Sequence, residues 1–153
     1  MRISVSSDMD EPVARHLVDE LRRRGHEVRT YGALRPEADR QWAVCSEAAA
    51  RDVAVGRADQ AVVCCWTGTG ASIAANKVPG IRAALCTDAY TADGARRWND
   101  ANVLALGLRL TSAPVLTEIL DAWFAASPSE DADDRSNVAH VGRIDADRAA
   151  ARD

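Results

Sequence analysis

The sequence predicts an α/β protein in which a five-stranded parallel sheet lies between two layers of helices. Short apolar runs of strand length alternate along the chain with segments whose apolar residues recur at helical spacing. After Gln60, the run to Cys65 is apolar without interruption, which is typical of a central parallel strand buried on both faces. Alternation of this kind produces parallel strands joined by right-handed crossovers, with helices on both faces.

Each predicted strand is followed by a predicted helix. The strands are expected at residues 3–6, 27–31, 60–65, 81–86 and 103–106. The helices are expected at residues 12–24, 42–55, 89–98 and 113–126, with a short helix beginning near Ala71. Pro12 suits the first turn of its helix, and Gly25 ends that helix. The order is that of a Rossmann-like three-layer α/β/α sandwich, in which ligands bind at the carboxyl ends of the strands.

The chain divides into one domain and a tail. Residues 1–126 are expected to form a single α/β domain, because 153 residues is the usual length of one domain. Residues 127–134 form an acidic, polar linker. The tail to residue 153 is expected to be a C-terminal docking segment, with a short helix at residues 137–144 and a frayed end.

Composition limits the partners of the protein. Charged residues make up 27% of the chain, the net charge is −4, and no cluster of Lys and Arg is dense enough for nucleic acid. No apolar run approaches the roughly 20 residues that cross a bilayer. The four cysteines form no C-x-x-C pair, so neither a metal site nor a disulfide framework is expected. We therefore expect a cytoplasmic protein that binds neither nucleic acid nor membrane.

The strongest chemical signal lies where the third strand ends, in the segment Cys65-Trp66-Thr67-Gly68-Thr69-Gly70-Ala71-Ser72. Gly68 and Gly70 let the backbone turn tightly and approach a ligand, and the free N–H groups of such a turn favour an anionic oxygen. A plain strand-to-helix turn explains the glycines about as well, because the pattern is neither G-x-G-x-x-G nor a P-loop.

Cys65 comes directly before this turn and the helix that follows it, and a thiolate at that point could move a proton of a substrate. Spacing alone favours the alternative that Cys65 is a small buried core residue, which is the commonest role of a free cysteine. Cys64 is expected on the opposite face of the strand. Cys45, Cys64 and Cys86 are interpreted as core residues.

Residues 65–77, which read C-W-T-G-T-G-A-S-I-A-A-N-K, resemble a family signature. The type B ribose-5-phosphate isomerases and the galactose-6-phosphate isomerase subunits carry C-G-T-G-x-G-x-S-x-x-A-N-K at this point. Residues 80–83 fit the G-I-R-A that follows in the family. Residues 99–109 resemble the family's N-D-x-N-V-L-x-x-G-x-R. The similarity extends over residues 3–125 without large gaps.

The resemblance implies an aldose–ketose isomerase that uses no metal and no cofactor. A base removes a proton beside the carbonyl, a cis-enediolate forms, and the proton returns to the neighbouring carbon. By resemblance, Cys65 is the base and Thr67 handles protons at the oxygens, while the substrate is a sugar or sugar phosphate. The resemblance also implies that the active site lies between the subunits of a homodimer or tetramer. The residues expected to bind substrate are Asp8, Met9, Trp66, Gly68, Thr69, Gly70, Ser72, Trp98, Asn99, Arg109, Ser136 and His140.

The sequence departs from the family where the substrate ring is opened and its phosphate is bound. Trp98 stands in place of the ring-opening histidine, and an indole donates a hydrogen bond but cannot shuttle a proton. Met9 replaces a phosphate-binding histidine. Ser136 and His140 replace two phosphate-binding arginines, and the nearby Arg135 and Arg143 are out of register.

Two further departures are aromatic. Trp66 replaces the glycine after the catalytic cysteine, and Trp42 replaces the tyrosine of a D-Y-P motif. Aromatic walls suit sugar faces or apolar groups better than a phosphate dianion. Ordinary packing in the core or at a subunit interface explains these tryptophans equally well.

Three functions remain open from the sequence. The first is an isomerase of an atypical substrate that is unphosphorylated or already open-chain. The second is ordinary ribose-5-phosphate isomerisation with substituted ligands. The third is a catalytically silent dimeric module that binds a ligand or regulates another protein, against which the retained Cys65, Thr67 and Asn99 argue.

Overall fold

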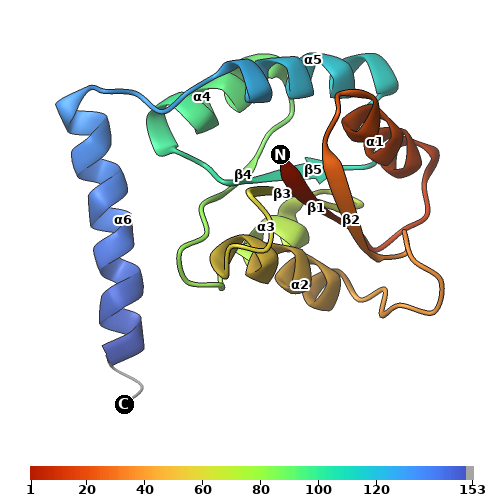
Figure 1. Ribbon diagram of the computed structural model, residues 1–153, viewed down its shortest axis with the longest axis horizontal. Coiled ribbons are helices and arrows are strands. Elements are labelled where there is room, and N and C mark those ends of the chain that lie inside the picture. The colour runs from red at the N-terminus through yellow and green to blue at the C-terminus, as the bar shows by residue number, and fades with distance from the viewer. Residues whose placement is uncertain (151–153) are drawn as a thin grey trace.

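The computed structural model describes residues 1–150 and confirms the three-layer sandwich (Figure 1). All strand pairs are parallel, in the order β2-β1-β3-β5-β4. The strands are β1 (Arg2–Ser7), β2 (Glu27–Gly32), β3 (Gln60–Cys65), β4 (Ala83–Leu85) and β5 (Val103–Gly107). The helices are α1 (Pro12–Arg23), α2 (Trp42–Ala54), α3 (Thr69–Ala75), α4 (Ala89–Asn99), α5 (Ala113–Ala125) and α6 (Ala132–Ala150).

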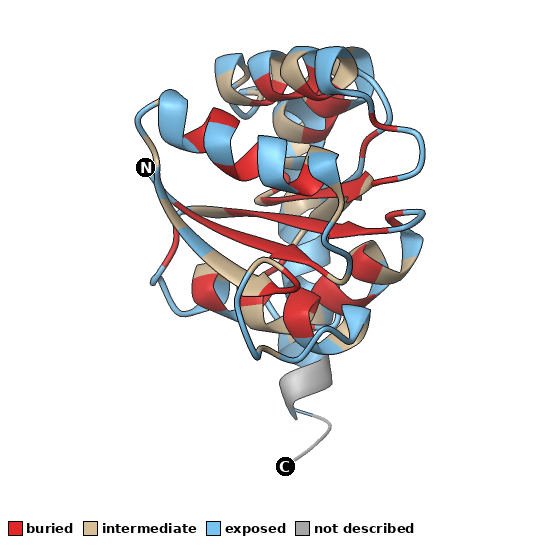
Figure 2. Cartoon of the chain, turned by 90° about the vertical axis from the view of Figure 1, so that its right-hand side faces the viewer, coloured by how far each residue is buried: buried red, intermediate tan, exposed pale blue. Residues whose placement is uncertain are grey.

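The sheet separates two apolar layers, because alternate residues of a strand point to opposite faces. Figure 1 shows α1, α4 and α5 on one face of the sheet and α2 and α3 on the other. Figure 2 shows long buried stretches in the sheet between them, and the central strands β1, β3 and β5 are the ones that are almost wholly buried. Cys64 packs in the layer with Leu17 and Trp123, whereas Cys65 packs in the layer with Ala49 and Ala71. The two adjacent cysteines therefore face opposite sides of the sheet, as predicted.

Asp52 fastens α2 to the sheet. Its carboxylate is buried and accepts hydrogen bonds from the Ser4 hydroxyl at 2.7 Å, the Tyr31 hydroxyl at 2.6 Å and the Arg57 Nε at 2.7 Å. Burial by itself raises the pKa of Asp52, but these hydrogen bonds outweigh it and hold the pKa below its usual value. The layer that carries α2 is thus held to the sheet by a charge whose hydrogen bonds are satisfied.

The structure corrects two element boundaries. The fourth strand, expected at residues 81–86, is only three residues long, because the Asn102 side chain takes the N–H of Arg82 at 2.9 Å. The C-terminal helix, expected at residues 137–144, begins at Ala132. The Asp131 side chain caps it by accepting the N–H of Asp133 at 2.9 Å.

Helix α6 stands clear of the sheet, at the side where α4 ends (Figure 1). The Asp145 side chain accepts the N–H of Gly80 at 2.8 Å and so links α6 to the domain. The helix continues through residue 150, beyond the expected fraying point, and the rest of the expected docking segment, residues 151–153, lies outside the described residues. Within residues 1–150, no helix combines the length and the apolar character that a membrane span requires.

Candidate active site

The turn between β3 and α3 lies directly against the end of β5. Gly68 adopts the left-handed conformation, with φ of 77°. A Cβ atom on Gly68 would lie 2.5 Å from Cδ1 of Leu85 and 2.8 Å from the backbone N of Gly107. A Cβ atom on Gly107 would in turn lie 2.8 Å from the carbonyl oxygen of Thr67. The approach of the two backbones therefore requires glycine on both sides.

Backbone hydrogen bonds hold the end of β3 beside the segment that follows β5. The carbonyl of Cys65 accepts the N–H of Leu108 at 3.0 Å, and the carbonyl of Trp66 accepts the N–H of Arg109 at 3.0 Å. The backbone of Arg109 therefore lies at the same edge of the sheet as Cys65.

The first turn of α3 exposes backbone donors to this edge. The N–H of Ser72 is already bonded to the carbonyl of Gly68 at 3.0 Å, so only part of the predicted cradle is free. The amides of residues 69–71 have no acceptor among the described residues, as is usual for the first turn of a helix. The hydroxyls of Thr67 and Thr69 lie 2.7 Å apart beside them.

The four cysteines are all buried, and only Cys65 lies at this turn. Burial raises the pKa of Cys45 to about 11 and that of Cys86 to about 12, and it also raises the pKa of Cys64. These three groups are therefore protonated thiols at neutral pH, which agrees with their interpretation as core residues.

Asp8 follows β1 at the same edge, and its Oδ1 atom is buried without a hydrogen-bond partner among the described residues. Burial raises the pKa of Asp8 above its usual value. A buried carboxylate oxygen normally has a partner, so this atom is available to accept a hydrogen bond from a ligand hydroxyl. Met9 comes next and is half exposed, and its carbonyl accepts the hydroxyl of Ser7 at 2.6 Å.

Three tryptophans leave large aromatic surfaces in solvent. Trp42, Trp66 and Trp98 are 46%, 45% and 42% exposed, so none of them is a core residue of this chain. The ring of Trp42 covers Gly70, where a Cβ atom would lie only 3.0 Å from it. The ring of Trp98 turns back along α4 and meets Tyr90 edge to face, with 6.0 Å between the ring centroids.

The remaining expected site residues lie away from the Cys65 turn. Helix α4 runs back from the carboxyl end of β4 and ends at Asn99. The residues just after it, Asp100 and Asn102, bond to Arg82 and Gly80 at the amino edge of the sheet. Two cavities, of about 470 and 350 Å³, are lined by both Trp98 and Asn99, and neither includes any residue of the Cys65 turn. His140, on α6, lines the larger one, whereas Ser136 is exposed and lines neither. One chain therefore does not bring the two groups together.

Comparison with known proteins identifies the family of this chain. The family model described as Ribose/Galactose Isomerase matches residues 3–142. This chain belongs to that family. Since the relatives below are isomerases, the chain is an isomerase as well.

Three relatives illustrate the range of the family. The chain is 39% identical to galactose-6-phosphate isomerase subunit LacB of Clostridium acetobutylicum over 130 residues, which are 82% of this chain and 73% of that protein. It is 33% identical over 112 residues to 4-deoxy-4-sulfo-D-erythrose isomerase of a Clostridium species, with 70% of this chain and 68% of that protein covered. The structure of ribose-5-phosphate isomerase B from Clostridium thermocellum superposes with a TM-score of 0.88 at 37% identity, with 97% and 99% covered.

The close approach at Gly68 is testable by substitution. We expect Gly68→Ala to lower the melting temperature more than Gly25→Ala, and to impair activity. Both glycines have positive φ, of 77° and 82°, so an alanine at either position carries a similar backbone strain of about 1–2 kcal/mol. A Cβ atom on Gly25 meets nothing within 4 Å, whereas on Gly68 it collides with Leu85 and Gly107. Equal losses in thermal unfolding would show that the packing of the turn is not tight.

Proposed function

We propose that this isomerase interconverts an aldose and a ketose through a cis-enediolate, with Cys65 as the base. The observation that carries the proposal is the position of Cys65, at the carboxyl end of β3 and directly before a turn whose first amides are free. A base and a set of oxyanion donors are the two components that proton transfer beside a carbonyl requires.

In the proposed reaction, the thiolate of Cys65 removes the proton from the carbon next to the carbonyl. The electron pair of the broken C–H bond forms the C=C bond, and the carbonyl electrons move to the oxygen. The amides of residues 69–71 are available to stabilise that oxygen, and the Thr67 hydroxyl relays a proton between the two oxygens. The Cys65 thiol then returns its proton to the neighbouring carbon, so no metal or redox cofactor takes part in the step.

The substrate is proposed to be bound by the remaining residues at both edges of the sheet. The unpartnered Oδ1 of Asp8 accepts a substrate hydroxyl. Arg109 contacts the far, anionic end of the substrate. Asn99, with Trp98 and the α6 residues, is supplied by a second copy of the chain, since Asn99 lies at the amino edge and Cys65 at the carboxyl edge. A homodimer, or a tetramer built from it, follows from this arrangement.

We further propose an open-chain substrate that lacks a phosphate dianion. Trp98 cannot open a sugar ring, and Met9 cannot bind a phosphate through a charged hydrogen bond. The sugar in the name of one relative, 4-deoxy-4-sulfo-D-erythrose, would need neither ring opening nor a phosphate-binding residue. Without a 4-hydroxyl it cannot close a five-membered ring, and a sulfonate carries one negative charge where a phosphate carries two.

The proposed catalytic role of Cys65 predicts a loss of turnover when Cys65 is replaced but not when Cys64 is replaced. Cys65→Ala should reduce turnover by at least about 100-fold, because a general base typically contributes about 10²–10⁴-fold. Cys64→Ala, one residue away on the opposite face, should retain activity. The measurement is entry of solvent deuterium into a panel of carbonyl sugars. Equal rates in the wild type and Cys65→Ala would remove the mechanism, and silence of the wild type across the panel would favour a binding or regulatory module.

The shared site predicts complementation between subunits. Cys65→Ala and Asn99→Ala should each be impaired alone. After the two variants are unfolded and refolded together, about a quarter of the sites in a symmetric dimer combine intact Cys65 with intact Asn99. Activity should return to about that fraction of the wild-type value. No recovery in a mixture that sedimentation shows to be dimeric would place the whole site within one chain.

Substrate choice provides the next prediction. Ribose 5-phosphate should be a poor substrate, because each charge-assisted hydrogen bond lost from the phosphate costs about 1.5–3 kcal/mol. The triple variant Trp98→His, Ser136→Arg and His140→Arg should raise activity on it. A wild-type kcat/KM of about 10⁴ M⁻¹s⁻¹ or more would instead favour ordinary ribose-5-phosphate isomerisation.

A further inference from the structure

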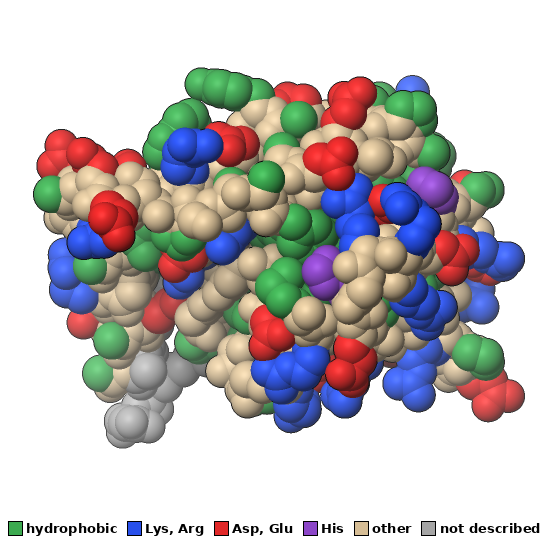
Figure 3. All heavy atoms as spheres, turned by 45° about the horizontal axis from the view of Figure 1, so that its top comes forward, with side chains coloured by type: hydrophobic (Ala, Val, Ile, Leu, Met, Phe, Trp, Pro, Cys, Tyr) green, Lys and Arg blue, Asp and Glu red, His purple; other side chains and the backbone are tan. Residues whose placement is uncertain are grey.

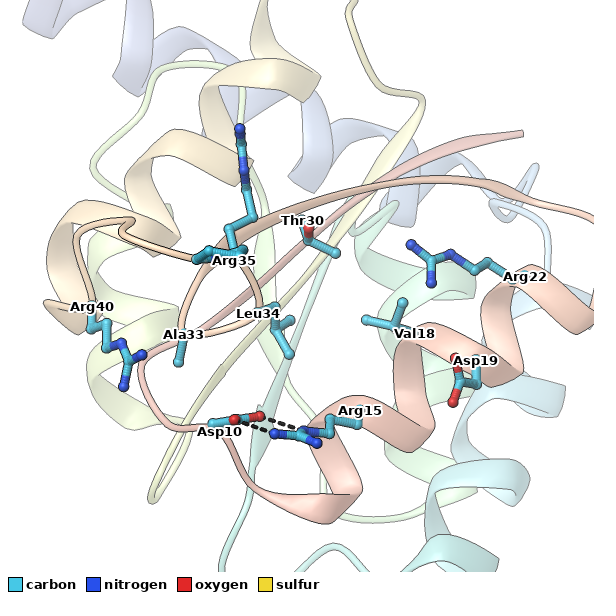
Figure 4. Close-up of a pocket in the computed structure, with 11 residues that line it drawn as sticks. Asp10, Arg15, Val18, Asp19, Arg22, Thr30, Ala33, Leu34, Arg35 and Arg40 are labelled. Carbon is cyan, nitrogen blue, oxygen red and sulfur yellow. Dashed lines mark hydrogen bonds and ion pairs between the residues drawn. The ribbon is translucent and has the colours of Figure 1, made fainter.

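A cavity of about 450 Å³ lies beside α1, on the opposite face of the sheet from the layer that holds Cys65. Figure 4 shows its walls, which come from α1, from β2 and from the loop that follows β2. Val18 and Leu34 form an apolar floor, and Thr30 contributes a hydroxyl. This volume lies within the range of about 300–1,000 Å³ that small-molecule sites occupy.

Positive charge dominates the lining of this cavity. Four arginines and two aspartates border it, namely Arg15, Arg22, Arg35, Arg40, Asp10 and Asp19. The carboxylate of Asp10 already has a partner, because Arg15 Nε donates a hydrogen bond to its Oδ1 at 2.6 Å. The hydrogen bond from Arg15 holds the pKa of Asp10 below its usual value, and the charge of Arg40 acts in the same direction. Two guanidinium groups therefore flank Asp10, as Figure 4 shows.

Most of the arginines whose side chains are described form ion pairs with carboxylates, but three of the four that line the cavity do not. Within the described side chains, five arginines form no ion pair, namely Arg22, Arg35, Arg40, Arg109 and Arg143. Three of these five line the cavity. Figure 3 shows blue side chains gathered on the right-hand part of that face, where α1 lies. The unpaired charge is thus concentrated around one hollow.

We propose that this cavity is a second binding site, which takes a small organic phosphate. The planar guanidinium fork matches the geometry of a phosphate and binds it with charge-assisted hydrogen bonds. The floor of Val18 and Leu34 accommodates the organic body of the ligand, and the Thr30 hydroxyl offers it a further hydrogen bond.

The cavity is connected to the active site through two loops. Asp10 comes two residues after Asp8, and Arg40 comes two residues before Trp42, whose ring covers Gly70 of the Cys65 turn.

The test is a titration of ¹⁵N-labelled protein with inorganic phosphate, with sodium chloride adjusted to keep the ionic strength constant. We expect saturable shifts of amide signals in residues 10–22 and 30–40, separate from any shifts in residues 65–72. Arg22→Gln combined with Arg40→Gln should weaken the first set by at least about 10-fold. The matched control is Arg51→Gln with Arg97→Gln, which removes the same charge from two exposed arginines elsewhere and should leave the affinity unchanged.

Two results would overturn the proposal. The first is a response in residues 10–22 and 30–40 that never saturates. The second is an equal loss of affinity in the control variant, which would show that phosphate binding depends only on the overall charge of the protein. The dispersion of the amide spectrum shows whether each variant is folded. Because binding is measured without turnover, failure here is distinct from failure of the proposed isomerase function.

Discussion

The contact between the β3–α3 turn and the end of β5 is the constraint on which the site depends. Gly68 and Gly107 face each other where no Cβ atom fits, so the two backbones bond directly. This contact fixes Cys65 at the mouth of the turn, and it brings the backbone of Arg109 alongside. Without it, Arg109 would not be held beside the turn that carries Cys65 and the free amides of residues 69–71.

Much of the fold could be predicted because it depends on local patterns. The apolar run to Cys65 gave β3 its correct bounds, and Pro12 correctly started α1. The short β4 could not be predicted, since it depends on the distant Asn102 side chain taking the N–H of Arg82. Nor could the length of α6, which has no apolar stripe and is started by the side chain of Asp131.

Only part of the candidate site could be predicted from the sequence. The Cys65 turn is contiguous in the chain, and it was therefore recognised as a unit. The separation of Asn99 from Cys65 depends on the direction in which α4 runs. The arginine-lined cavity could not be predicted from the sequence. Its lining residues, such as Arg22 on α1 and Arg40 in the loop after β2, come from separate elements and form no motif.

In the proposed reaction, one copy of the chain supplies Cys65 from the carboxyl edge of its sheet, and the other copy supplies Asn99 from the amino edge. In that proposed arrangement, a mutation near Asn99 or along α6 changes what one copy presents to the other without touching the backbone around Cys65. Under the proposed mechanism, selection can therefore replace residues at the amino edge step by step while the turn that carries Cys65 stays intact. Such a protein can acquire a new substrate by replacing the residues that bind the substrate.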